Sequence, residues 1–281
     1  MSDAACVEFL QWALPCLGLR WAGFRKVRGQ VCKRVKRRIS ALGLEGFAAY
    51  RQRLETDRPE WDVLDRCCHV TISRFFRDAC VFDTVRAKVL PAIAAHAQQD
   101  RRDARCWSAG CASGEEPYTL KMLWDLDLFS AFPDVALSIV ATDIDEKVLE
   151  RARAGCYRAT SLRPLPSRFI AHGFESAGPV LRVRPAHREG VTFLHQDLRS
   201  HAPPGPFDIV FCRNLAFTYF ADALQQRVLD TFSERLRPNG YLVVGAHEQV
   251  QDRRFVPLEG VPHVFCKSPS FPAHNTQSVW G

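Results

Sequence analysis

The feature that most constrains this chain is an alternation of short β-forming runs with helical runs between residues 105 and 245. The runs predict, in chain order, strand 105–109, helix 118–128, strand 136–143, helix 147–154, strands 191–194 and 207–212, helix 223–236 and strand 241–245. Strands separated by helices pair in parallel, because each helix carries the chain back across the sheet. We therefore expect an α/β fold with a doubly wound, Rossmann-like sheet, and a small β insertion at about 164–190.

Composition excludes several other classes of protein. The chain of 281 residues is 47% apolar and 25% charged, which is typical of an ordinary globular chain. No run approaches the roughly 18 apolar residues that cross a membrane, so we expect no membrane span. The first residues lack the basic start of a signal peptide, and we expect a cytoplasmic protein. The eleven cysteines are scattered without a Cys-x-x-Cys pair, so we interpret them as thiols and expect no metal site.

The positive charge is concentrated near the N-terminus. Residues 1–70 hold 13 basic and 8 acidic side chains, a net charge of +5 out of +7 for the chain. Apolar residues recur there at helical spacing, namely Trp21, Phe24, Val27, Val31, Val35, Ile39 and Leu42. Basic residues occupy the other side, namely Arg25, Lys26, Arg28, Lys33, Arg34, Lys36, Arg37 and Arg38. This pattern predicts one basic amphipathic helix, which is either an ordinary solvated face or a docking surface for an acidic partner. Aromatic residues are not interleaved with the charges, so we expect no nucleic-acid partner.

Gly43 supplies the C-cap of the basic helix. Two further helical patterns, 47–54 and 61–68, follow it on either side of Pro59. We predict a small N-terminal helical domain over residues 1–75 and a larger domain over 76–267. Residues 268–281 are rich in serine, proline and polar side chains, and we interpret them as a disordered tail.

Residues that follow the predicted strands indicate where a ligand binds, because open α/β sheets bind ligands beyond the carboxyl ends of their strands. The first strand leads into a loop of small residues, 108–117, that includes Gly110 and ends in two glutamates. This loop is neither a P-loop nor Gly-x-Gly-x-x-Gly, and its acidic end would repel a pyrophosphate. Asp143 follows the second strand, where a carboxylate can accept hydrogen bonds from both ribose hydroxyls. A cofactor with a ribose and a base but no phosphate is favoured, and S-adenosylmethionine is the simplest choice.

Several segments together carry a family resemblance. They are Ser73–Asp78, Trp107–Tyr118, Ala141–Asp145, Phe211–Asn214 and Leu236–Gly240, behind a basic helix. In this order they resemble the CheR-type chemotaxis receptor methyltransferases from about residue 18 to residue 266. The resemblance implies a Rossmann-like class I methyltransferase sheet, a helical N-terminal domain, and transfer of a methyl group from S-adenosylmethionine to a glutamate carboxylate.

The resemblance also implies particular site residues. Those that match the family's cofactor contacts are Thr71, Ser73, Arg77, Gly110, Glu116, Asp143, Asp197, Leu198, Arg213 and Asn214. Tyr219 resembles the tyrosine that faces the methyl group, with an ordinary aromatic core role as the alternative. Arg77 is the other expected catalytic residue, because its guanidinium group can hold a carboxylate by two hydrogen bonds; an ion pair with Asp78 or Glu116 is its alternative. A substrate carboxylate is already ionised at pH 7, so this chemistry needs no general base.

This sequence departs from the family's pattern at three places, which bear on the methyl acceptor and on the contact to the adenine of the cofactor. The segment Val70–Ser73 is shorter than the commoner form, the spacing from Asn214 to Tyr219 is one residue longer, and Asp197 replaces a more frequent asparagine. The acceptor is therefore either an acidic protein docked on the basic helix or a small carboxylic acid, for example a dicarboxylic acid. A regulatory module that binds the cofactor without turnover is the third alternative.

Overall fold

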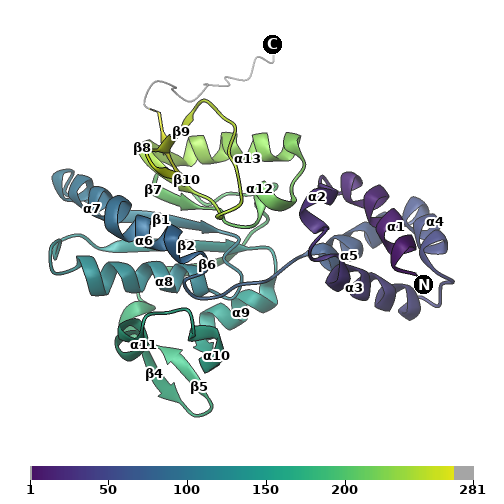
Figure 1. Cartoon of the computed structure of the whole chain (residues 1–281), viewed down its shortest axis with the longest axis horizontal. Coiled ribbons are helices and arrows are strands. Elements are labelled where there is room, and N and C mark those ends of the chain that lie inside the picture. The colour runs from purple at the N-terminus through teal and green to yellow at the C-terminus, as the bar shows by residue number, and fades with distance from the viewer. Residues whose placement is uncertain (1, 269–281) are drawn as a thin grey trace. The chain divides into compact units, whose positions relative to one another are not determined.

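The computed structural model describes residues 2–268, which form two compact units (Figure 1). Of the described residues, the first unit combines 2–71 with 215–226, and the second combines 72–214 with 227–268. The predicted tail, apart from Ser268, lies outside the described residues. No helix within residues 2–268 is both long and apolar enough to cross a membrane.

The first unit is helical. Its helices are α1 (Asp3–Cys16), α2 (Trp21–Phe24), α3 (Arg28–Ala41), α4 (Phe47–Thr56), α5 (Arg58–Cys68) and α12 (Ala216–Tyr219). The predicted apolar stripe is correct, since Phe24, Val31, Val35 and Ile39 are buried. Gly43 ends α3 at φ +67°, and the Gly43 and Leu44 amides donate to Ser40 and Ile39.

The single helix predicted from Trp21 to Leu42 is wrong, because the chain breaks between α2 and α3. The cause is the close approach of α2 to the segment 215–226. A Cβ atom on Gly23 would collide with the Thr218 carbonyl, and the Arg20 amide donates to the Tyr219 carbonyl at 2.8 Å. These contacts fix the direction of α2 separately from that of α3.

The prediction that every cysteine is a thiol is also wrong. Cys6 of α1 and Cys32 of α3 form a disulfide, with Cα atoms 6.0 Å apart. Both residues are buried in the helical core. Their separation of 26 residues follows no recognisable disulfide spacing, so only the packing of α1 on α3 reveals the pair.

The second unit contains a seven-stranded sheet in the order β6-β2-β1-β7-β8-β10-β9. Its strands are β1 (Ala104–Ala109), β2 (Leu137–Asp143), β6 (Val191–His195), β7 (Phe207–Phe211), β8 (Leu236–Val243), β9 (Phe255–Leu258) and β10 (Val261–Lys267). The first five of that order pair in parallel, and β10 is antiparallel to both neighbours. This topology confirms the predicted doubly wound, Rossmann-like α/β class. The β9–β10 pair was not predicted.

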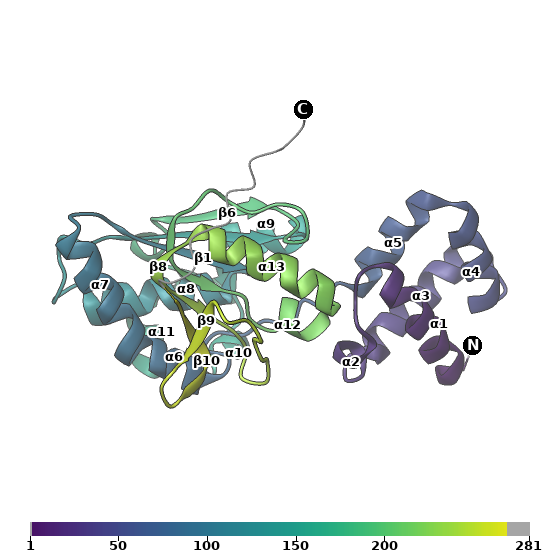
Figure 2. The same ribbon diagram turned by 90° about the horizontal axis from the view of Figure 1, so that it is seen from above.

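Helices cover both faces of this sheet. They are α6 (Ala79–Thr84), the π-helical η1 (Val85–Val89), α7 (Leu90–Gln99), α8 (Glu115–Leu123), the π-helical η2 (Trp124–Leu128), α9 (Glu146–Ala154) and α13 (Asp222–Arg235). Cys106 of β1 belongs to the core that α7 and α8 fill. Its neighbour Trp107 points to the opposite face, where the centroid of its ring lies 5.3 Å from that of Phe232 of α13. Figure 2 shows α13 running along the sheet.

The predicted β insertion lies between α9 and β6 (Figure 1). It is a three-stranded antiparallel sheet in the order β3-β5-β4. Its elements are β3 (Cys156–Tyr157), α10 (Ala159–Leu162), α11 (Ser167–Gly173), β4 (Phe174–Ala177), β5 (Val180–Val183) and the 3₁₀ turn η3 (Pro185–His187). The insertion therefore begins earlier than predicted, with β3.

Candidate functional site

The loop after β1 is shaped by backbone conformations that few side chains allow. Gly110 and Gly114 have φ values of +80° and +88°, and Ala112 has +47°. The Gly110 amide donates to the Thr142 carbonyl at 2.8 Å, which ties the loop to the end of β2. A Cβ atom on Gly114 would lie 3.0 Å from Ala152. The loop therefore stays close to the sheet edge, as its small residues predict.

Asp143 stands at the end of β2 with its carboxylate fixed by backbone amides. One oxygen accepts from the Ala112 amide at 2.8 Å and the other from the Asp145 amide at 3.0 Å. Asp145 itself caps α9, since its side chain accepts from the Lys147 amide at 3.0 Å. The structure therefore brings Asp143 and the loop after β1 together. The residue that caps α9 is Asp145 and not Asp143.

Asp197 and Leu198 follow β6, the strand next to β2. The Gln196 amide donates to the Asp143 carbonyl at 3.0 Å, so this turn is joined to the end of β2. Arg199 holds the Asp197 carboxylate, with Nε 3.0 Å from both oxygens and Nη2 2.9 Å from Oδ2. Sequence reasoning did not identify this pairing, although the two residues are only two positions apart.

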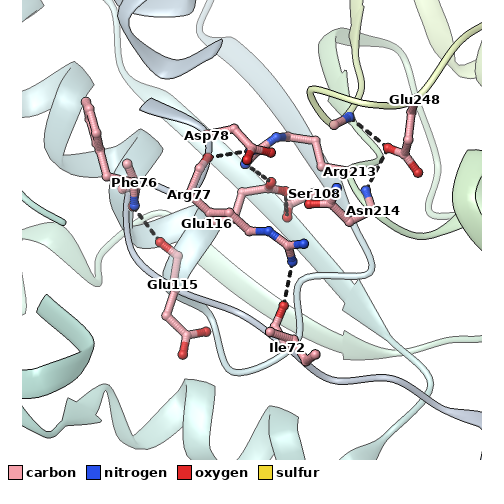
Figure 3. A network of polar contacts seen from close by, with 12 residues as sticks. Ile72, Phe76, Arg77, Asp78, Ser108, Glu115, Glu116, Arg213, Asn214 and Glu248 are labelled. Carbon is pink, nitrogen blue, oxygen red and sulfur yellow. Dashed lines mark hydrogen bonds and ion pairs between the residues drawn. The ribbon is translucent and has the colours of Figure 1, made fainter. Parts of the chain in front are cut away.

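Glu116 and Arg213 form the centre of a buried ionic network (Figure 3). The Glu116 carboxylate accepts from the Ser108 hydroxyl at 2.8 Å and from Arg213 Nη1 at 3.1 Å. Arg213 Nη2 donates to Asp78 at 2.9 Å and also to the Arg77 carbonyl. The Arg213 side chain is only 3% exposed, and its guanidinium group lies over the Phe82 ring. This arginine therefore joins the end of β7 to the start of α8 and to the segment before α6.

Arg77 has a different environment from the one that its sequence neighbours suggest. Its Nη1 donates to the Ile72 carbonyl at 2.7 Å (Figure 3). The alternative role, an ion pair with Asp78 or Glu116, belongs instead to Arg213. Phe76 and Asp78 on either side of Arg77 have positive φ values of 53° and 59°. Such conformations are costly and are enriched where a chain clamps a ligand.

Asn214 follows Arg213 in a left-handed conformation with φ +55°. Its amide donates to Glu248 Oε2 at 2.7 Å, and the Gly245 amide donates to the same oxygen at 2.7 Å. A Cβ atom on Gly245 would collide with the Asn214 side chain. Glu248 was missed by sequence reasoning, because it lies 34 residues from Asn214 in an irregular stretch that gives no periodic signal.

Glu115 was also missed, although it is adjacent to Glu116. Its side chain is buried, with 4% exposed, and within residues 2–268 its Oε2 atom has no hydrogen-bond partner. Burial raises the pKa of the Glu115 carboxyl group, while its own backbone amide and Ser73 act in the opposite direction. Two consecutive glutamates therefore have different surroundings, one with an arginine partner and one without.

Two predicted residues, Thr71 and Tyr219, belong to the first unit and are described with it. Thr71 is partly buried at the end of that unit's N-terminal stretch. The Tyr219 ring packs against Phe24, with centroids 4.9 Å apart. This contact fits the aromatic packing role that the sequence left open, and the methyl-facing role stays a prediction.

The basic face of α3 is smaller than the sequence suggests, because three of its arginines have partners. Arg34 donates to the Cys67 carbonyl at 3.3 Å, and Arg28 lies 3.7 Å from Asp3. Arg38 pairs with buried Glu60 at 2.6 Å, and this hydrogen bond lowers the pKa of the Glu60 carboxyl group. The other cations of this region are Arg25, Lys26, Lys33 and Arg37, which are exposed, and Lys36, which is partly exposed.

Residues 2–268 contain no group of three histidine, cysteine, aspartate or glutamate side chains placed to hold an ion. The polar groups at the sheet edge are instead carboxylates held by amides, hydroxyls and arginines.

Comparison with known proteins identifies relatives over most of the chain. The family model described as "CheR methyltransferase, SAM binding domain" matches residues 71–261. A chemotaxis protein methyltransferase of Escherichia coli is 34% identical over 81% of this chain and 79% of its own length. One from Salmonella typhimurium is 34% identical over 88% and 84%. An uncharacterised 104.1 kDa protein of Rhodobacter capsulatus is 35% identical over 80% of this chain, which spans only 24% of that protein.

Proposed function

Because the chain belongs to the CheR methyltransferase family, whose S-adenosylmethionine-binding domain it contains, we propose that it methylates carboxylates. The product is a methyl ester, and the acceptor is a glutamate side chain of an acidic protein. S-adenosylmethionine supplies an electrophilic methyl group on a sulfonium centre. The chain's own residues bind the cofactor and align the acceptor with it.

The residues at the sheet edge fit a cofactor of this kind. Backbone amides fix both oxygens of the Asp143 carboxylate at the end of β2, where a carboxylate can accept hydrogen bonds from ribose hydroxyls. Asp197, fixed by Arg199, can accept a hydrogen bond from the amino group of adenine, with Leu198 as the apolar neighbour. The loop with Gly110 and Gly114 permits close approach of a ligand to the backbone. Glu116, Arg213 and Asn214 hold the loops around this edge, and Ser73 and Thr71 complete the proposed contacts.

One observation carries the proposal, namely the division of roles between two arginines. Arg213 takes the carboxylates of Asp78 and Glu116, so Arg77 does not neutralise them. Within residues 2–268 the Arg77 guanidinium hydrogen-bonds the Ile72 carbonyl, a neutral group. A guanidinium with this surrounding retains its charge and donors for an incoming carboxylate. We assign Arg77 to hold either the acceptor carboxylate or that of the cofactor.

Positioning is then the main source of catalysis. A glutamate side chain has a pKa of about 4.3 and is ionised at pH 7, so no residue has to remove a proton. Holding two reactants in near-attack geometry can contribute roughly 7 to 11 kcal/mol to lowering a barrier. Tyr219 is assigned, on the family resemblance, as the aromatic side chain that faces the methyl group.

A second candidate function differs from the first in its methyl acceptor, which is a small carboxylic acid instead of a protein. The five surface cations near α3 favour an acidic protein partner, since clustered charge steers an oppositely charged surface. The longer spacing between Asn214 and Tyr219 favours instead a changed acceptor, such as a small carboxylic acid. A family member of this type would act in the cytoplasm, where its protein acceptors are exposed.

The test is transfer of labelled methyl groups from S-adenosylmethionine to host proteins and, in parallel, to a panel of small carboxylic acids. We expect base-labile label on protein. Arg77→Ala should reduce transfer at least about a hundredfold, because a bidentate contact at the reacting carboxylate is lost. Arg163→Ala, which changes an exposed arginine, is the matched control and should retain full activity.

The other outcomes separate the alternatives. If only a small acid carries the label, the methyl acceptor is a metabolite and not a protein. Absence of transfer in the presence of measured cofactor binding would indicate a regulatory module. Full activity of Arg77→Ala would remove the assigned role of that residue.

A further inference from the structure

Tyr157, in the β insertion, contacts two segments of the proposed site at once. It is 4% exposed and donates its hydroxyl proton to the Ser113 carbonyl at 2.6 Å. Its ring packs edge-to-face against Phe75, with centroids 4.7 Å apart. Ser113 belongs to the loop after β1, and Phe75 lies two positions before Arg77. One side chain of β3 therefore joins the loop after β1 to the segment that carries Arg77.

The hydrogen bond to Ser113 supports a part of the loop with costly backbone conformations. Ser113 stands between Ala112 and Gly114, whose φ values are +47° and +88°. The Ala112 amide donates to the Asp143 carboxylate at 2.8 Å, so Asp143 holds one residue of the loop and Tyr157 holds the next. Burial raises the pKa of the Tyr157 hydroxyl group well above its ordinary value, so the group keeps its proton at neutral pH and can donate it. Without this donor, the loop would lose a support next to Asp143.

Phe75 carries the second contact toward Arg77. It is fully buried and lies edge-to-face against Tyr157 of β3 and Phe174 of β4, at centroid distances of 4.7 and 5.4 Å. Aromatic pairs in this arrangement contribute more than the area that they bury, so they favour one orientation of the Phe75 ring. On the other side, Arg213 donates to the carbonyl group of Arg77 itself. The backbone of Arg77 is thus held from both sides, which fixes the point from which its guanidinium group reaches a carboxylate.

We propose that Tyr157 is a positioning residue of the methyl-transfer reaction, which holds the loop after β1 through Ser113 and the backbone of Arg77 through Phe75. This inference rests on the proposed function, which makes Asp143 and Arg77 contacts to the cofactor or the acceptor. The hydroxyl group of Tyr157 then sets the affinity for S-adenosylmethionine, because it keeps the loop against Asp143. The ring sets the alignment of Arg77 with the carboxylate that it holds.

The first test removes the hydroxyl group and keeps the ring. Tyr157→Phe loses only the hydrogen bond to Ser113, so the dissociation constant of S-adenosylhomocysteine, measured by calorimetry, should rise about three- to tenfold. The kcat at saturating S-adenosylmethionine, with the acceptor that the labelling assay identifies, should stay within about twofold of wild type. The contact with Phe75 is retained in this variant, so the support of Arg77 is unchanged.

Tyr118→Phe is the matched control for this variant. Tyr118 of α8 is also buried, and it donates its hydroxyl proton to the Ala152 carbonyl of α9 at 2.9 Å. Each variant loses one buried hydrogen bond to a backbone carbonyl, so each should lower the melting temperature by about 2 to 4 °C. Only Tyr157→Phe should bind S-adenosylhomocysteine more weakly. Equal weakening in both would assign the effect to lost stability and overturn the role of the Tyr157 hydroxyl group.

The second test addresses the ring. Phe75→Leu keeps an apolar side chain but loses both edge-to-face contacts, so kcat should fall about tenfold or more, because a displaced Arg77 no longer holds near-attack geometry. Phe232→Leu is the control, since it loses an edge-to-face contact with Trp107 that involves neither segment, and its kcat should equal that of wild type.

A double variant shows whether the ring acts through Phe75. Tyr157→Leu removes the ring and the hydroxyl group together, so it should combine weaker S-adenosylhomocysteine binding with a lower kcat. If Tyr157 reaches Arg77 through Phe75, the kcat of Tyr157→Leu/Phe75→Leu should lie within about twofold of that of Phe75→Leu. Multiplied losses of kcat in the double variant would show independent actions and overturn this connection.

The outcomes are distinct from failure of the proposed function. If wild type neither binds S-adenosylhomocysteine nor transfers methyl groups, the proposed function fails and this inference fails with it. If wild type binds the cofactor without transfer, methylation fails, while the affinity of Tyr157→Phe still decides the role of the hydroxyl group. In an active wild type, unchanged affinity in Tyr157→Phe overturns the role of the hydroxyl group, and unchanged kcat in Phe75→Leu overturns that of the ring. Both losses, shared by neither control, support the inference.

Discussion

Arg213 joins three segments that are far apart in the sequence. Its guanidinium group contacts Glu116 at the start of α8, Asp78 before α6 and the Arg77 carbonyl, and it is almost fully buried. The planar fork of five N–H donors suits this task, because it reaches two carboxylates and a carbonyl in fixed directions. The segment Phe76–Asp78 is therefore held in place by a residue more than a hundred positions away in the sequence.

Arg213→Lys should lose this connection. A lysine ammonium group cannot reproduce the fork, so one of the two partly buried carboxylates loses its ion pair, which costs about 1.5 to 3 kcal/mol. We expect a lower free energy of unfolding by urea and at least tenfold weaker S-adenosylhomocysteine binding, from about 1.4 kcal/mol or more. Arg237→Lys is the control, because Arg237 pairs with Asp208 at 3.5 Å outside this network. Wild-type affinity in Arg213→Lys would contradict the role given to Arg213.

For single residues, the sequence and the family resemblance predicted where a side chain lies in the fold better than which side chain it bonds. Asp143 and Gly110 lie at the sheet edge as predicted, because residues at strand ends are fixed by the fold itself. The partner of Asp78 and Glu116 was not predictable, since Arg77 is closer in sequence and equally suitable in chemistry. Glu248 gave no signal at all, because a single glutamate in an irregular stretch is indistinguishable from a solvated side chain.

Among the elements, the helices α1 and α3 are joined by a covalent bond that composition argued against. Cys6 and Cys32 lie at buried positions of these two helices. A cross-link stabilises mainly by restricting the unfolded chain, and the effect grows with the length of the closed loop. The stability of the helical unit should therefore depend on redox conditions.

Reduction should lower the free energy of unfolding by about 3 to 4 kcal/mol for a loop of this length, separated by 26 residues. Urea unfolding followed by circular dichroism, with and without a phosphine reductant, measures this difference. The double variant Cys6→Ala/Cys32→Ala is the control and should not respond to reductant. An unchanged midpoint for fully reduced wild type, verified by mass, would show that the bond contributes nothing to stability.

The elements also show where periodicity is informative. The buried parallel strands β1, β2 and β7 were predicted within a few residues, because their apolar runs are short and separated by helical patterns. The break between α2 and α3 was missed, because it is caused by a tertiary contact at Gly23 and not by a local signal. Helices α6 and α7 and the β9–β10 pair gave no pattern strong enough to predict.

For the whole molecule, charge is distributed unevenly along the chain. Residues 1–70 carry a net +5 of the total +7. Arg28, Arg34 and Arg38 are engaged within the helical unit. If the acceptor is an acidic protein, as we propose, the remaining surface cations are the ones that would steer it. Interactions of this kind weaken with salt, since the Debye length is about 10 Å at 0.1 M.

The triple variant Lys33→Glu/Lys36→Glu/Arg37→Glu should therefore lower kcat/KM for an acidic protein acceptor by about tenfold or more. Increasing salt should produce the same decline in wild type and little further decline in the variant. The matched control, Lys88→Glu/Arg163→Glu/Arg253→Glu, makes the same charge change at exposed sites outside the helical unit. Equal losses in both variants would reject docking on α3 in favour of a general charge effect.

The helical unit is assembled from two separate stretches of the chain. The segment 215–226 pairs with the N-terminal stretch, with a bridge between Leu19 and Phe220 and a hydrogen bond from the Ala221 amide to the Gly18 carbonyl at 2.8 Å. A fragment that ends at residue 71 would therefore lack the segment 215–226 that packs against it. The remaining fragment would expose Phe217 and Phe220, which are buried in the whole chain. An exchange of N-terminal regions with a relative must consequently transfer both stretches together.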